Sequence, residues 1–301
     1  MHYYQPPVDY IEPVFRPPSE ADSLILQVTN GCSWNRCTFC DMYIDEHKGF
    51  RPKAESDVLA EIERCGQAMP WVRRVFLADG DAMALSVRRL RSILEAIRKH
   101  LPQVRRVSAY CLPANLKRKS VADLQQLREL GLTLVYMGAE SGSDSVLAAF
   151  DKGETFESTA EALLKAQEAG IKRSVMLING AGGKRYSDEH AEASARLVNV
   201  TQPEYLATLV LFFRRGAEQR VRAGYDGDFE PLSAEGLFRE MQQLIGATEL
   251  EQTIFRSDHV SNALVLKGTL GRDRSRMLDE IETAIEWART HHIPLRQQGS
   301  F

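Results

Sequence analysis

Apolar and polar positions follow one another in a regular succession of strand-like and helix-like segments. Short apolar runs predict strands at 24–28, 74–78, 106–110, 132–138, 171–178 and 205–213. Between them, apolar residues recur every three or four positions and predict helices near 58–69, 87–97, 120–131, 156–169 and 187–200. Six strands separated by helices indicate parallel pairing with right-handed crossovers, so an α/β fold is expected.

The two ends of the chain have a different texture. Clustered prolines predict that residues 1–21 form an extended, irregular segment over the surface of the main domain. Helical stripes after residue 213, such as the one formed by Leu237, Met241 and Leu244, predict a helical cover. Three parts are therefore expected, with boundaries at 1–21, 22–213 and 214–301.

A few polar residues mark the predicted helix ends. Ser56 is a plausible first cap, and Ser120 with Asp123 forms a capping-box pattern. Gly131 is placed to end the helix that Ser120 begins.

Composition limits the cellular setting. The net charge of -3 over 301 residues provides no general attraction for nucleic acid. No apolar stretch approaches the roughly 18 residues of a membrane span, and the N-terminus lacks the basic-then-apolar pattern of a secretion signal. Five cysteines, three of them clustered, do not resemble a disulfide framework. The expected location is cytoplasmic, without membrane contact.

The three clustered cysteines carry the strongest chemical signal. Cys32, Cys37 and Cys40 follow the first predicted strand directly. Three nearby thiolates can hold one face of a four-iron cluster and leave its fourth iron free for another molecule.

Two other site types remain open for these cysteines. A plant-type [2Fe-2S] electron carrier needs a fourth cysteine, which Cys65 could supply. A zinc-stapled binding protein could use Cys65 or His47 as its fourth ligand. Cys65, however, lies on the apolar stripe of a predicted helix, where a buried thiol is expected.

Polar and glycine-rich turns follow several other predicted strands. Because the carboxyl ends of parallel strands meet at one edge, these turns are expected to converge on one mouth. The turns are Asp79-Gly80-Asp81-Ala82, Gly138-Ala139-Glu140-Ser141-Gly142 and Asn179-Gly180-Ala181-Gly182-Gly183.

In these turns and their order, the chain resembles the radical S-adenosylmethionine (radical SAM) superfamily, and its elongator-type and methylthiotransferase-type branch is the most similar part. The resemblance covers about residues 22–213 and implies a partial (βα)6 TIM-like barrel with a helical C-terminal extension. The cysteine spacing has four residues between Cys32 and Cys37, where three are commonest, and Asp79 and Asp81 stand where the family usually has Gly and Glu.

The resemblance also implies roles for individual residues. Cys32, Cys37 and Cys40 would bind a [4Fe-4S] cluster, and Phe39 would lie near the adenine of S-adenosylmethionine. Three turns would contact the remaining groups of the cofactor. The methionyl amine would be contacted by Asp79, Gly80 and Asp81, and the ribose and methionine groups would be contacted by Glu140 and Ser141. The region beside the adenine would be formed by Asn179, Gly180 and Gly182.

The implied reaction is reductive cleavage of S-adenosylmethionine to a 5′-deoxyadenosyl radical, which takes hydrogen from a substrate. A small organic substrate is expected, with tRNA or a peptide as alternatives. A low-potential flavodoxin or ferredoxin would donate the electron, and the cluster would be oxygen-sensitive. No catalytic acid or base stands out, and His190 and Cys111 are expected to be ordinary structural residues.

Overall fold

The computed structural model describes residues 5–291 and 293. These residues form two compact units. Unit 1 takes the chain up to Asn35, Met42–Met137 and Leu164–Arg173, and unit 2 takes Arg36–Asp41, Gly138–Leu163 and the chain from Ser174 onward. The ends of the predicted segments 1–21 and 214–301, namely residues 1–4, 292 and 294–301, lie outside the described residues.

Unit 1 is built on parallel strands. Their order is β1-β4-β5-β6, and each pairs in parallel with its neighbour. The last four residues of β4 are all buried, which explains why this segment is a continuous apolar run rather than an alternating one. The strands are β1 (Leu24–Gln27), β4 (Arg74–Ala78), β5 (Arg106–Tyr110) and β6 (Leu132–Glu140), and a separate hairpin pairs β2 (Thr29–Asn30) with β3 (Arg51–Pro52).

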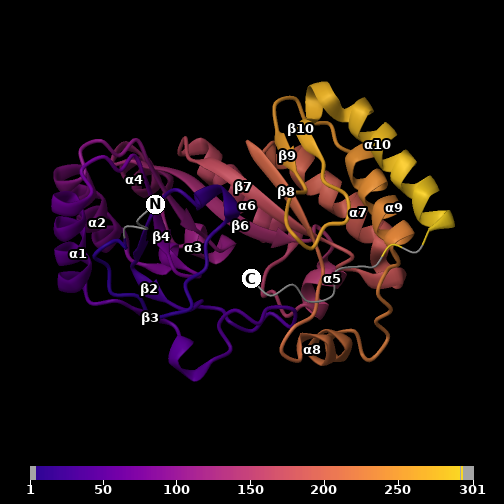
Figure 1. The fold of residues 1–301 in the computed structure, drawn as a ribbon, viewed down its shortest axis with the longest axis horizontal. Helices are drawn as coiled ribbons and strands as arrows, with labels where there is room; N and C mark the ends of the chain where they lie inside the picture. The colour runs from indigo at the N-terminus through magenta and orange to yellow at the C-terminus, as the bar shows by residue number, and fades with distance from the viewer. Residues whose placement is uncertain (1–4, 292, 294–301) are drawn as a thin grey trace. The chain divides into compact units, whose positions relative to one another are not determined.

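Helices separate these strands along the chain. Helices α1 (Glu55–Ala68) and α2 (Val87–His100) pack side by side (Figure 1). The capping box of Ser120 and Asp123 is confirmed at the start of α4 (Val121–Glu129), but the cap expected at Ser56 is wrong. Helix α1 begins one residue earlier, at Glu55, so Ser56 lies inside its first turn. The remaining short elements are α3 (Pro113–Lys117), η1 (Pro18–Glu20), η2 (Glu46–Lys48) and η3 (Ala82–Ala84).

The N-terminal segment is anchored in unit 1 by one buried carboxylate. Glu20 is fully buried and accepts hydrogen bonds from Ser108 at 2.9 Å and Tyr136 at 2.6 Å. Arg106 pairs with the same carboxylate at 2.9 Å. The segment therefore contacts side chains of β5 and β6 through Glu20, whereas the sequence predicted a segment that lies only on the surface.

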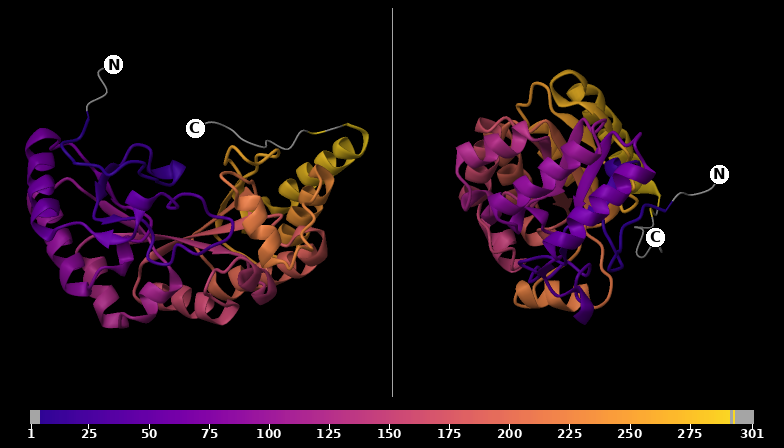
Figure 2. Two further views of the ribbon diagram at one scale, coloured as in Figure 1. Left: turned by 90° about the horizontal axis from the view of Figure 1, so that it is seen from below. Right: turned by 90° about the vertical axis from the view of Figure 1, so that its left-hand side faces the viewer.

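Unit 2 continues the parallel pattern. Strand β7 (Lys172–Asn179) pairs in parallel with β8 (Tyr205–Val210), as predicted for the last two strands. Helices α9 (Ala234–Gly246) and α10 (Leu270–Thr290) lie side by side in Figures 1 and 2, and α7 (Gly183–Thr201) packs against α9. The other helices are α5 (Asp144–Ala149), α6 (Phe156–Glu168) and α8 (Ala217–Gly224).

Two strands in the C-terminal part were not predicted. Strand β9 (Ile254–Arg256) pairs in parallel with β8, and β10 (Lys267–Thr269) pairs with β9 in the antiparallel sense. Three residues are too few to show a strand period. The six predicted strands and the α/β class are confirmed, and the C-terminal part combines helices with this short sheet extension. No helix among the described residues is long and apolar enough to span a membrane.

Candidate functional site

The cysteine loop is divided between the two units. Cys32 belongs to unit 1, whereas Cys37 and Cys40 belong to unit 2. All three are partly exposed and none forms a disulfide. In the described part of the chain, no three or more His, Cys, Asp or Glu side chains are gathered at metal-binding distance, so the ligand set stays a prediction.

Within unit 2, the second half of the loop is held through its backbone. Arg220 of α8 donates to the carbonyls of Thr38 at 3.2 Å and Cys40 at 3.1 Å. The Cys40 amide donates to the Cys37 carbonyl at 3.1 Å, which closes a turn between the two thiols. Arg220 thus holds the backbone of this turn in place. No local pattern in the sequence points to this role of Arg220, because it lies 180 residues beyond Cys40.

The aromatic residue of the loop has a defined environment. The ring of Phe39 lies 4.7 Å from that of Phe150, centroid to centroid. The Thr38 amide donates to the Phe150 carbonyl at 2.9 Å, so the loop is docked against the end of α5. Contact of Phe39 with an adenine stays a prediction.

In unit 1, Asp79 is already saturated. Its carboxylate pairs with Lys48 at 2.6 Å and accepts from the Tyr43 hydroxyl at 2.8 Å, and neither charged side chain of the pair is exposed. Burial raises the pKa of Asp79, while the hydrogen bonds from Lys48 and Tyr43 oppose that rise. This arrangement is that of a buried structural ion pair.

Asp81, two residues further on, differs in one respect. Its Oδ2 atom accepts from Ser33, the neighbour of Cys32, and from Asn115 at 3.4 Å. Its Oδ1 atom is buried and has no hydrogen-bond partner among the described residues. Burial raises the pKa of Asp81, so a cation placed at Oδ1 would stabilise the ionised form. A buried acceptor without a partner is the feature that a methionyl amine would satisfy.

Gly80, between the two aspartates, leaves no room for a side chain. A Cβ atom on Gly80 would lie 2.5 Å from the ring of Tyr43, whose hydroxyl binds Asp79. A side chain at this position would displace the group that holds the turn, so the glycine supports the shape of the turn whatever binds there.

In unit 2, the turn after β6 is also tied to its surroundings. Glu140 has a positive φ of 64° and pairs with Lys152 at 2.9 Å. The Ser141 hydroxyl lies 2.8 Å from Nδ1 of His190, and the Gly142 amide donates to Ser194 at 2.9 Å. The last two partners lie on α7 and come from the same unit.

The turn after β7 depends on a residue from the C-terminal part. The Gly180 amide donates to Glu240 of α9 at 2.5 Å, and Nδ2 of Asn179 donates to the Leu237 carbonyl at 3.2 Å. Oδ1 of Asn179 is buried without a partner among the described residues. At Gly182, a Cβ would lie 2.6 Å from the Tyr186 carbonyl, so only glycine fits. His190, expected from the sequence to be an ordinary structural residue, and Glu240, which no sequence pattern singled out, both support these turns. Neither contact could be predicted, because each joins residues that lie far apart in the sequence.

Two alternatives for the cysteines lose their proposed fourth ligand. Cys65 is fully buried in α1, and burial raises its pKa to about 11, which disfavours the thiolate that a metal requires. Nε2 of His47 lies 3.0 Å from the Glu12 carbonyl and is engaged there.

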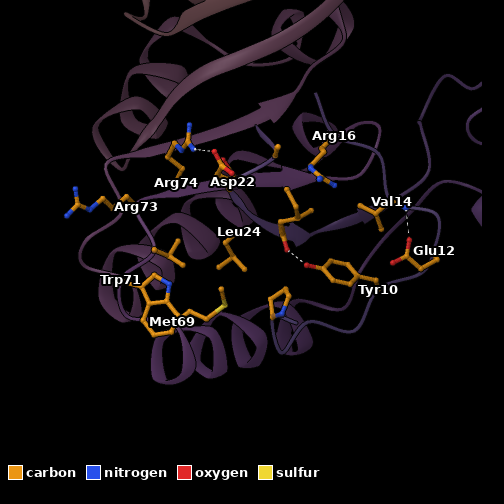
Figure 3. Close-up of a pocket in the computed structure, with 15 residues that line it drawn as sticks. Tyr10, Glu12, Val14, Arg16, Asp22, Leu24, Met69, Trp71, Arg73 and Arg74 are labelled. Atoms are coloured by element: carbon orange, nitrogen blue, oxygen red, sulfur yellow. Dashed lines mark hydrogen bonds and ion pairs between the residues drawn. The ribbon is translucent and has the colours of Figure 1, made fainter. Parts of the chain in front are cut away.

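One cavity of unit 1 lies elsewhere, at the amino ends of β1 and β4 (Figure 3). Its volume is about 680 Å³. In Figure 3, Tyr10 donates to the Ile25 carbonyl and Arg74 pairs with Asp22, so part of its polar lining is internally satisfied. The predicted turns follow the carboxyl ends of β4, β6 and β7, and none of their residues lines this cavity.

Comparison with known proteins gives a family match. The model of the Radical SAM superfamily matches residues 26–198, more than half of the chain. Members of this superfamily use a [4Fe-4S] cluster and S-adenosylmethionine. The matched segment contains all three clustered cysteines and the turns after β4, β6 and β7.

Individual relatives are distant and longer. The 4′-phospho-dehydrooxetanocin synthase of Priestia megaterium is 25% identical over 174 residues, which cover 52% of this chain and 23% of the relative.

Two solved structures share the fold. The radical S-adenosylmethionine methyltransferase TsrM of Kitasatospora setae, bound to tryptophan and a SAM analogue, matches with a TM-score of 0.59 and 16% identity, covering 88% of this chain and 62% of its own. The cobalamin-dependent radical enzyme OxsB matches with a TM-score of 0.52 and 19% identity, covering 88% and 36%. This chain therefore spans only part of the length of these proteins, and the likeness supports the predicted partial barrel.

Proposed function

Because the chain belongs to the radical SAM superfamily, we propose that it is a radical enzyme that binds a [4Fe-4S] cluster through Cys32, Cys37 and Cys40. The observation that carries the proposal is that these three cysteines lie inside the segment matched by the family model. When bound, the cluster supplies the electron that cleaves S-adenosylmethionine into methionine and a 5′-deoxyadenosyl radical.

The residues of the chain would bind and position the cofactors. Oδ1 of Asp81 would accept a hydrogen bond from the methionyl amine, which would give this buried acceptor a partner. Phe39, packed on Phe150, would provide an apolar surface that keeps water from the adenine. Arg220 would hold the turn between Cys37 and Cys40 in place. Asp79 would support the turn through Lys48 rather than contact the amine.

The substrate and partners are separate proposals. A small organic substrate is favoured over tRNA because the net charge of -3 supplies no general attraction for RNA. A flavodoxin or ferredoxin would deliver the electron. The elongator-type and methylthiotransferase-type branch is proposed on the sequence of the turns alone, and substrate identification would test it.

Anaerobic reconstitution tests the central proposal. The protein is loaded with iron and sulfide and supplied with S-adenosylmethionine and dithionite, and 5′-deoxyadenosine is measured by mass spectrometry. Production is expected in the wild type and should disappear in Cys37→Ala together with the bound iron. Cys65→Ala, a matched change at a buried thiol outside the loop, should keep both. A protein with two irons, or with zinc alone, would refute the proposal.

A further inference from the structure

A buried polar network in unit 2 connects the turn after β6 with the turn after β7. His190, which is 1% exposed, lies on α7. Nδ1 of His190 lies 2.8 Å from the Ser141 hydroxyl, and Nε2 lies 3.8 Å from Oε1 of Glu240. One imidazole thus lies between the turn after β6 and Glu240, the residue whose carboxylate holds the turn after β7.

The protonation state of His190 fits this bridging role. Burial lowers its pKa to about 4, so the ring is neutral at pH 7. A neutral imidazole has one donor and one acceptor nitrogen. The Ser141 oxygen accepts from the Ser143 amide at 2.9 Å, so its hydroxyl hydrogen is available to donate to Nδ1. Nε2, which lies beside the Glu240 carboxylate, then carries the ring proton.

Glu240 holds the second half of the network. Its Oε1 atom accepts from the Gly180 amide at 2.5 Å, and its Oε2 atom accepts from the Ser187 hydroxyl at 2.6 Å. The residue is 3% exposed and comes from α9, outside the segment matched by the family model. Gly180 has a positive φ of 84°, so its amide direction is set by an unusual backbone conformation. Glu240 is the partner that stabilises that direction.

We propose that His190 and Glu240 are positioning residues for S-adenosylmethionine, which fix the backbones of segments 138–142 and 178–183 from the helix side. This inference rests on the proposed function, because those two segments are the predicted contacts of ribose and adenine. Neither residue touches the cofactor in this scheme. Their effect is to keep the two turns in one binding conformation, so that less ordering is needed when the cofactor binds.

The test compares Glu240→Leu with Glu240→Gln. Leucine leaves the Gly180 amide and the Ser187 hydroxyl without a partner, whereas glutamine keeps an acceptor for the amide. Isothermal titration of S-adenosylmethionine into the cluster-loaded protein, without reductant, should show a Kd about tenfold higher for Glu240→Leu. Glu240→Gln should stay within about twofold of the wild type.

Hydrogen–deuterium exchange of the apoprotein gives a second readout, independent of the cluster. Glu240→Leu should speed exchange in peptide 176–184, while His190→Leu should speed it in both 138–143 and 176–184. Glu235→Leu is the matched control, because this glutamate of α9 is half-buried and pairs with Arg239 and Arg289, not with either turn, and the change should alter neither peptide. If Glu240→Leu does not fold, Ser187→Ala removes one hydroxyl of the network and should raise the Kd about threefold.

The failure of this inference differs from failure of the proposed function. Wild-type protein that binds no S-adenosylmethionine would contradict the proposed function. Tight binding by the wild type with unchanged Kd and exchange in Glu240→Leu would overturn the inference and leave the proposed function intact.

Discussion

The turn after β4 and the turn after β7 achieve rigidity in different ways. In the β4 turn, the side chain of Asp79 is the buried acceptor, and Lys48 and Tyr43 close around it. In the β7 turn, the backbone amide of Gly180 is the buried donor, and Glu240 supplies the acceptor from a helix 60 residues away. The buried carboxylate of the β4 turn belongs to the turn itself, whereas the carboxylate that holds the β7 turn belongs to α9.

This difference shows which polar groups are available to a ligand. The carboxylate of Asp79 is fully engaged by Lys48 and Tyr43. In the β4 turn, Asp81 is therefore the acidic residue that has a buried oxygen without a hydrogen-bond partner among the described residues. In the β7 turn, both oxygens of the Glu240 carboxylate already accept hydrogen bonds, one from the Gly180 amide and one from the Ser187 hydroxyl. A ligand would therefore meet a fixed backbone conformation at the β7 turn and a buried carboxylate oxygen at the β4 turn.

The largest expected effect is on the stability of unit 1. Asp79→Asn removes the partner of the fully buried Lys48 ammonium, so the free energy of unfolding should fall by about 3–5 kcal/mol. Urea denaturation followed by circular dichroism measures it. Asp22→Asn, which affects the exposed pair with Arg74, should change little. Equal stability of the two variants would show that the buried pair is not a structural requirement.

The next largest effect is the pH dependence of stability that Glu240 causes. Burial raises the pKa of Glu240 to about 7, above its ordinary value near 4.5. The folded state therefore holds this proton more tightly than the unfolded state, and the resulting stability is present at low pH and lost as pH rises through about 7. Between pH 5 and pH 8 this group should cost roughly 2–3 kcal/mol.

Glu240→Gln isolates that contribution. The variant has no proton to lose at this site, so denaturation curves at pH 5 and pH 8 should differ less than those of the wild type. A wild-type pH dependence that the variant reproduces in full would place the titrating group elsewhere.

A smaller effect is expected on cofactor affinity in the β4 turn. Asp81→Asn keeps an oxygen acceptor but loses the negative charge, so the affinity for S-adenosylmethionine should fall by about 2 kcal/mol, or about thirtyfold. Calorimetric titration of the cluster-loaded protein measures this, with Asp279→Asn on the exposed side of α10 as the control. Unchanged affinity would exclude Asp81 as the amine acceptor.

The smallest effect is on backbone shape in the β7 turn. Gly180→Ala places a side chain at a φ of 84°, which costs about 1–2 kcal/mol. Its Cβ would lie 2.8 Å from the end of the Leu237 side chain, which can move. Thermal unfolding should detect the loss, and an unchanged melting temperature would mean that the turn can rearrange without cost.

Much of the fold could be predicted from sequence because its signals are local. The strand at 106–110 and the capping box at Ser120 depend on residues that are neighbours in the chain, and both are observed. The start of α1 was missed because Ser56 resembles a cap although its neighbour Glu55 already begins the helix. The strands β9 and β10 were missed because each has only three residues.

The site divides along the same line. By itself, the sequence determined the succession of strands and helices, the cysteine loop and the acidic and glycine-rich turns, since each is a short pattern with its own physical signature. Only the tertiary structure decided that Asp79 is paired with Lys48, that Asp81 retains an oxygen without a partner, and that Gly180 is held by Glu240. A buried polar group is satisfied by whatever group the chain crossings bring beside it, and that choice leaves no trace in local periodicity.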